Sequence, residues 1–233
     1  MSIRFYKIIF LLAFILPIHM FALEANVSVG AVTEFPLGIG AQGTFHLPQA
    51  QLHLNFRYLK FLSSYIDVMN ETAQNLEFYN TATGDLIYEV LHNASMWEIG
   101  LGWSQAPADG WYGEVGYTST TGAGEATGST ILEAVSGTSL PSGGNIYDLW
   151  GKVDSVIFRI GYKFLFNEYG SLHLAAGFLK PIATDTELDR SVSGPIQQAI
   201  LDAANRELDE YLSDTLENDV YIPLLNLGWL YTF

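Results

Sequence analysis

Charged residues on the mixed face of alternating segments are the first candidates for chemistry. They are Arg57, Glu98, Glu114, Arg159 and Lys163. Each stands in a segment where large apolar residues recur at every second position, so its side chain points away from them. Enclosed charges must be paired, because an unpaired buried charge costs several kcal/mol. We expect an Arg57–Glu98 pair and a cluster of Glu114 with Lys163 and Arg159. This charge network forms either a gate on a narrow ion path or a plug of salt bridges.

Histidines are the second candidates. His46, His53 and His173 fall near the same end of their segments, and imidazole groups bind metals such as zinc. Their segments are not all neighbours and no ligand spacing supports a metal site, so we predict neither a metal nor a cofactor. His92 lies close to Ser95, and these residue types serve hydrolysis and acyl transfer, but no recognisable motif surrounds them.

The N-terminal segment has the features of a targeting signal. Arg4 and Lys7 precede an apolar core, after which Ala22 or Ala25 marks the expected cut. The core is short for a membrane span of about 20 apolar residues, so a retained anchor is the weaker alternative. We predict a signal peptide at 1–22 and one domain at 23–233.

Composition excludes several classes of function. The net charge of −15 argues against a nucleic-acid partner, because phosphates would be repelled. The chain has no cysteine, so an exported domain must hold together without disulfides. After the N-terminal segment, no stretch is long and apolar enough for a transmembrane helix. Residence in a membrane would therefore have to be by β-strands.

The last segment, Asp219 to Phe233, is strongly alternating. Its large or apolar residues occupy every second position: Tyr221, Pro223, Leu225, Leu227, Trp229, Tyr231 and Phe233. The opposite face is smaller and more mixed, which is the pattern of a strand between two environments. This segment resembles the closing strand of bacterial outer-membrane β-barrels. In that family the last strand is read by the barrel-insertion machinery, which the resemblance implies as a partner.

Eight alternating segments account for most of the mature chain. They lie at about 24–34, 37–46, 51–61, 95–105, 111–119, 152–166, 171–179 and 219–233. The long connections lie at about 62–94, 120–151 and 180–218, with helix-like pieces near 65–78, 85–92 and 130–135. The connections after the second, fourth and sixth segments are short.

This order of short and long connections matches the family pattern of short periplasmic turns and long outer loops. The resemblance is to the small OmpA-, OmpX- and OmpW-like class. It implies an all-β fold, an eight-stranded antiparallel transmembrane β-barrel with long, partly helical extracellular loops, located in the bacterial outer membrane. Ten strands remain an alternative if residues 85–92 and 145–150 pair.

Aromatic residues test this arrangement, because they gather at both membrane boundaries of such barrels. The expected periplasmic girdle is Trp103, Trp111, Trp229, Tyr231 and Phe233. The expected outer girdle is Tyr58, Trp97, Tyr117 and Tyr221. The alternative is a soluble lipocalin-like barrel with these large residues inside, but eight strands leave an interior barely wide enough for side chains. A lumen this narrow fits the small, mixed faces better and favours the plug over the gate.

The last long connection is acidic and has helical spacing from Ser193 to Leu216. Ser193 suits a helix cap, Pro195 suits an early helical position, and apolar residues form a loose stripe. We expect this stripe to pack on the other outer loops as a cap; a partner or the bilayer surface is the alternative. Lipopolysaccharide suits an acidic helix only if divalent cations bridge its phosphates.

These features predict an integral outer-membrane barrel that is not an enzyme. Its outer loops would serve structure, adhesion or the binding of an extracellular partner. Its wall would contact outer-membrane lipid and lipopolysaccharide. One alternative is a narrow pore or transporter for small hydrophobic solutes. Another is a lipid A-modifying enzyme, since some outer-membrane barrels use a His and a Ser at the outer rim.

Overall fold

The computed structural model describes most of the chain after residue 25. The described residues are 26–47, 50–75, 81–106, 109–136, 146–189, 205–206, 209–210, 213, 216 and 220–233. The signal peptide expected at 1–22 lies outside the described residues, as does most of the helix expected from Ser193 to Leu216. The few described residues of that helix, such as Asn205 and Asp209, are helical.

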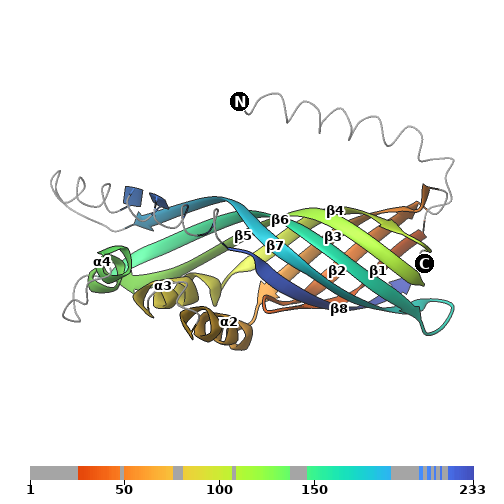
Figure 1. The fold of residues 1–233 in the computed structure, drawn as a ribbon, viewed down its shortest axis with the longest axis horizontal. Helices are drawn as coiled ribbons and strands as arrows, with labels where there is room; N and C mark the ends of the chain where they lie inside the picture. Colours follow the sequence, from red (N-terminus) through yellow and green to blue (C-terminus); the bar gives the residue numbers. More distant parts are fainter. Residues whose placement is uncertain are drawn as a thin grey trace, which may run out of the picture.

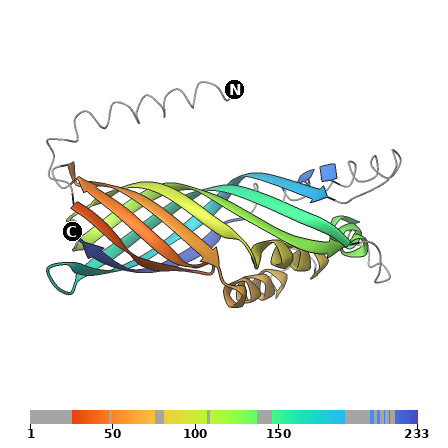
Figure 2. The same cartoon turned by 180° about the vertical axis from the view of Figure 1, so that it is seen from behind.

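Eight antiparallel strands close into a barrel in chain order, with β8 pairing back onto β1 (Figures 1 and 2). Their bounds are β1 Asn26–Phe35, β2 Gly38–Leu47, β3 Leu52–Phe61, β4 Ser95–Ser104, β5 Gly110–Thr127, β6 Ile146–Leu165, β7 Gly170–Asp189 and β8 Ile222–Thr232. The expected fold class is confirmed. The ten-stranded alternative is wrong, because residues 85–91 are helical and residues 146–150 begin β6.

The two ends of the barrel differ. Short connections join β2 to β3, β4 to β5 and β6 to β7 at the end where the C-terminus lies, and the helices lie at the opposite end (Figure 1). We call these the turn end and the outer end. In barrels of this type the short turns face the periplasm and the long connections face outward.

The barrel wall is apolar outside and polar inside. Exposed and buried residues alternate along the strands, as a period of two requires. Trp97 and Trp229 are 41% and 54% exposed, whereas Arg57 and Lys163 are each 1% exposed. The large apolar side chains therefore face lipid, and the soluble lipocalin-like alternative is wrong.

Strands β5, β6 and β7 continue well beyond the outer ends of their neighbours (Figures 1 and 2). Residues 120–127, 146–151 and 183–189 pair as strands, so the loops expected at 120–151 and 180–218 are partly strand. We call these outer parts, with the helices packed on them, the outer extension. The β6–β7 register shifts between Asp154 and Ser155, where the extension leaves the barrel, and such a bulge bends the paired strands.

Three described helices lie at the outer end: α2 Ser63–Asn75, α3 Thr81–Leu91 and α4 Gly128–Ser136. They occupy the helix-like pieces of the sequence with shifted bounds. Helices α3 and α4 pack on the outer extension around a small apolar core of Ala82, Leu86, Ala126, Ile131, Ala134 and Leu149. Among the described residues, no helix is long and apolar enough to cross a membrane.

Two glycines let α3 approach β5 closely. A Cβ added at Gly122 would lie 2.1 Å from the carbonyl oxygen of Val90, and one at Gly124 would lie 2.3 Å from that of Glu89. These neighbours are backbone atoms, so a side chain at either glycine would push α3 away from the strand. A stretch rich in Gly, Ser and Thr predicts a loop, but here the glycines allow a helix to cover a strand.

Replacing Gly122 by Val should loosen α3 while the barrel stays closed, because overpacking costs about 1–3 kcal/mol and this clash lies outside the barrel wall. Limited proteolysis of the refolded protein would measure the change as faster cleavage within α3. Heat-modifiable gel migration, in which unboiled and boiled samples run differently, would check that the barrel is intact.

Gly43→Val is the matched control for this substitution, since a Cβ at Gly43 meets no described atom within 4 Å. If both variants were cleaved at the same rate, the close approach of α3 to β5 would not be what holds the helix.

Candidate functional site

Five strands bring charged side chains together inside the barrel. This charge layer consists of Glu34 of β1, Arg57 of β3, Glu98 of β4, Glu114 of β5 and Arg159 of β6, all of them buried. The strand register sets Arg57 opposite Glu98 and Glu114 opposite Arg159. Opposite charges at directly opposed positions stabilise the pairing of neighbouring strands.

Arg57 links two carboxylates on one side of the charge layer. Its Nη1 donates to Glu98 Oε1 at 2.8 Å and to Glu114 Oε1 at 2.9 Å, and its Nε donates to Gln42 Oε1 at 2.8 Å. Glu114 also accepts a hydrogen bond from Asn55 Nδ2. The amide side chains of Gln42 and Asn55 thus form hydrogen bonds with atoms of the charged groups beyond the ion pairs. Buried charges are tolerated in a protein only when such hydrogen bonds are satisfied.

Arg159 holds three carboxylates from three strands. Its Nε and Nη2 donate to the two oxygens of Glu34 at 2.7 and 2.6 Å, which is a bidentate pair. Its Nη1 and Nη2 donate to the two oxygens of Glu98 at 2.6 and 2.7 Å, and Nη1 also reaches Glu114 Oε1 at 3.0 Å. Every other ionic contact in the layer therefore shares a carboxylate with this guanidinium.

Lys163 lies inside the barrel but outside this cluster. The register sets Lys163 opposite Gly110 and Arg159 opposite Glu114, so Lys163 lies nearer the turn end. Its Nζ donates to Ser104 Oγ at 3.0 Å and lies 5.2 Å from the centre of the Tyr112 ring. Of the cluster expected around Glu114, the contact with Arg159 is present at 3.0 Å. Arg57, which was expected to pair with Glu98, also contacts Glu114, at 2.9 Å.

Glu34 is a member of the charge layer that the sequence reading missed. The first alternating segment expected from the sequence ends at residue 34, and a carboxylate at the end of a strand normally reaches solvent. A signal was present, because Ser28, Val32 and Glu34 share one face by a period of two. Extending the inward face through the last residues of the strand would have found it.

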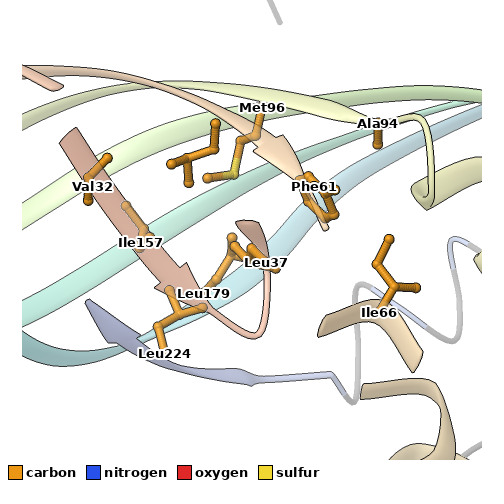
Figure 3. Close-up of a cluster of buried hydrophobic side chains, with 10 residues drawn as sticks. Val32, Leu37, Phe61, Ile66, Ala94, Met96, Ile157, Leu179 and Leu224 are labelled. Carbon is orange, nitrogen blue, oxygen red and sulfur yellow. The ribbon is translucent and has the colours of Figure 1, made fainter. Parts of the chain in front are cut away.

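An apolar layer fills the outer part of the lumen (Figure 3). Its buried members are Val32, Leu37, Leu59, Phe61, Ala94, Met96, Ile157, Leu179 and Leu224 of the barrel and Ile66 of α2. On β3, β4 and β6, an apolar member stands one inward position nearer the outer end than the charged residue of the same strand. On these three strands, packed apolar side chains therefore lie between the charged residue and the outer end, whereas on β1 Val32 lies on the turn-end side of Glu34.

A belt of rings crosses the lumen on the other side of the charge layer, toward the turn end. We call His46, His53, Tyr112 and His173 the histidine belt. Its successive ring centres are 5.9, 6.0 and 5.8 Å apart. The structure thus brings near one another the histidines that the sequence placed at one end. Within the described part of the chain, no group of three or more His, Cys, Asp or Glu residues could hold a metal ion.

His92 stands apart from Ser95 in its contacts. Its Nδ1 is 2.8 Å from the carbonyl oxygen of Glu89, and its Nε2 is 2.6 Å from Asn93 Nδ2. The ring stacks on Tyr88 with centres 5.6 Å apart. Both ring nitrogens are therefore engaged by groups other than the Ser95 hydroxyl, so the geometry of a His–Ser pair is not in place.

The aromatic residues expected in two girdles lie on the outside of the barrel. At the outer boundary Tyr58 is opposite Trp97, whose ring is 5.5 Å from that of the half-buried Tyr117. The Tyr221 hydroxyl accepts a hydrogen bond from Lys180 Nζ at 3.0 Å. The five residues expected in the periplasmic girdle lie toward the turn end: Trp103, Trp111, Trp229, Tyr231 and Phe233.

A groove of about 610 Å³ runs along the outside of the wall across β4 to β7. Gly113 and Ala176 lie along it, with Leu101, Trp103 and Phe158 among the larger lining residues. These outward positions are at the level of membrane hydrocarbon, where lipid chains contact a barrel wall.

Comparison with known proteins gives distant structural likenesses only. No family model and no curated protein matches this chain. A major outer membrane protein from Thermus thermophilus is 13% identical at a TM-score of 0.45, covering 90% of this chain and 99% of its own. CarO2 and CarO of Acinetobacter baumannii are 12% and 10% identical at TM-scores of 0.34 and 0.36. They cover 89% and 88% of this chain and 99% and 97% of theirs.

At these TM-scores the likenesses carry no argument of their own. The class of protein is decided by which side chains of the barrel wall face outward and which face the lumen. Closure pairs the backbone of every strand and the ion pairs lie inside, so the barrel exposes no unpaired polar edge to its surroundings. Its large apolar side chains face outward, and they leave contact with water only when lipid surrounds the wall. The chain is a β-barrel protein of the bacterial outer membrane.

Replacing Arg159 by Met should destabilise the barrel by about 3–5 kcal/mol, because removing one partner leaves buried carboxylates unpaired. Urea unfolding of the protein refolded into lipid vesicles would measure the change. Lys60→Met is the matched control, since Lys60 is an exposed cation on β3 and surface substitutions stay within about 0.5 kcal/mol.

Combining Glu34→Gln with Arg159→Met tests whether the bidentate pair is energetically coupled. Residues in one ionic network typically couple by about 0.5–3 kcal/mol, so the double variant should lose less stability than the two single variants together. Strict additivity would mean that the Glu34–Arg159 pair contributes nothing beyond its separate members.

Proposed function

We propose that this protein is a non-conducting barrel, without enzymatic activity, that holds a structured surface above the outer membrane for contact with an extracellular partner. One observation carries the proposal. The lumen is filled by the charge layer and the apolar layer, while three strands continue past the rim and carry α3 and α4. The structured surface available for a function is therefore the outer extension, and the described side chains leave no open path through the lumen.

The contacts in the lumen support a plug rather than a gate. A gate needs a group that can swing aside, but Arg159 is held by three carboxylates and Arg57 by two. Moving either guanidinium would break several charge-assisted hydrogen bonds within a buried site. Even with the charge layer open, the apolar layer would still separate it from the outer end.

The outward face of the outer extension supports contact with a partner. The register sets Glu125 opposite Asp148 and Asp148 opposite Asp189, so carboxylates of three strands lie in one row. Asp185 and Glu187 continue the exposed acidic face on β7. Like charges directly opposed destabilise a sheet, so this face is arranged at some cost in stability. Its charge favours a basic partner surface over the phosphates of lipopolysaccharide.

The two alternatives find less support. A lipid-modifying enzyme would need His92 free to activate a nucleophile, but both of its ring nitrogens have other partners. A transporter for small hydrophobic solutes would need a route through the apolar layer, whose members are all buried against one another.

The refolded protein should give no steady ion current across a planar lipid bilayer, because neither layer of the lumen offers a continuous wet path. Conductance at both voltage polarities, against protein-free bilayers, would measure this. A steady current that Glu114→Ala abolished would contradict the plug and support a pore.

Partner contact can be tested with single cysteines that carry a photo-crosslinker, since the natural chain has no cysteine. Glu187→Cys on the outer extension should give a discrete adduct on intact cells. Glu168→Cys, which is also exposed but lies at the turn end, should give no adduct with the same partner. If neither position gave an adduct, the outer extension would have lost its proposed role.

A further inference from the structure

Three polar atoms of the histidine belt are buried without a hydrogen-bond partner among the described residues. They are His46 Nε2, His53 Nδ1 and the Tyr112 hydroxyl. Their side chains are only 2%, 1% and 2% exposed. An unsatisfied buried polar group costs about 1–3 kcal/mol, and three such groups in neighbouring rings point to a bound polar molecule.

A small cavity adjoins the belt at the turn end. Its volume is about 20 Å³, and its lining includes His46, Gln51, Ser104 and Gln105. A cavity needs about 10–15 Å³ to hold one water molecule, and that water needs two to four polar partners. The cavity is large enough for one water molecule, and its lining includes polar side chains: His46, whose Nε2 is unpartnered, and Gln51 and Gln105. Ser104 Oγ already donates to the carbonyl oxygen of Ala106 and accepts from Lys163 Nζ, so it can only accept one further hydrogen bond.

The chemistry of the belt suits water better than an ion. His53 Nε2 lies 3.2 Å from Glu114 Oε2, and an imidazole that donates from Nε2 presents a lone pair at Nδ1. The Tyr112 hydroxyl can donate, so the belt offers both a donor and an acceptor. The ammonium of Lys163, 5.2 Å from the centre of the Tyr112 ring, opposes a metal cation. The lone pair of His53 opposes an anion.

We propose that the turn end of the lumen is a hydrated chamber, in which ordered water bridges His46, His53 and Tyr112. The chamber wets the charge layer from the periplasmic side, because His53 joins the belt to Glu114. The apolar layer keeps the same charges dry from the outer side. A barrel that conducts no ions would thus still exchange water with one compartment.

The wild-type protein in detergent micelles allows a direct test by nuclear magnetic resonance. Magnetisation transferred from water should reach the ring protons of His46 and His53. It should not reach the methyl groups of Met96 and Ile157 in the apolar layer. Absence of transfer to both histidine rings would overturn the proposal, and so would equal transfer to the apolar layer.

Two substitutions that each remove one unpartnered hydroxyl give an independent readout. Thr118 Oγ1 is buried and unpartnered away from the belt, so Thr118→Val should raise the folding equilibrium constant at least about fivefold by removing an unsatisfied group. Tyr112→Phe should lower that constant instead, because the bridging water loses a partner. If Tyr112→Phe raised stability as Thr118→Val does, the chamber would be dry.

Discussion

The pairing of charges inside a narrow barrel is the constraint on which the rest of this structure depends. Eight strands enclose too little space for bulk water, so each charged group must find its partners among other side chains. Arg159 meets that requirement for three carboxylates at once and draws in residues from β1, β4 and β5. The same contacts fix the stagger between strands, since a slip of one residue would turn a charge toward lipid.

The sequence was sufficient to predict the barrel, because large apolar residues recur at every second position along its strands. Alternation along β3 and β4 separates Trp97 from Glu98 and Arg57 from Tyr58 without any knowledge of the register. The Arg57–Glu98 contact also followed, because the two residues lie on neighbouring strands at similar heights. The Glu114–Arg159 contact also followed, because both residues belong to the expected cluster. The additional contact of Glu114 with Arg57, across the lumen, did not follow from positions along single strands.

The length of β5, β6 and β7 could not be derived from local composition. Residues near Gly122 and Gly124 have low strand propensity, yet they pair with β6 and leave room for α3 to approach β5. The paired length of these strands therefore depends on contacts between elements that are distant in the chain. Glu34 differs, because its inward position follows from the period of two along β1 alone.

The lumen is therefore graded along its axis, with imidazole rings at the turn end, ion pairs in the middle and hydrocarbon at the outer end. Each layer limits which groups the neighbouring layer can contact. Ions moving inward from outside would meet hydrocarbon first, where a charge is least tolerated.

The unbroken run of β5–β7 from the wall into the outer extension also has a mechanical meaning. Ladder hydrogen bonds continue from inside the bilayer to the tip, and the register shift beside Asp154 is the one described irregularity in the pairing of these strands. A lateral force on the tip of the outer extension would therefore be transmitted along these three strands into the barrel wall. The strands would bend at the bulge beside Asp154, and the force would act on one side of the wall only.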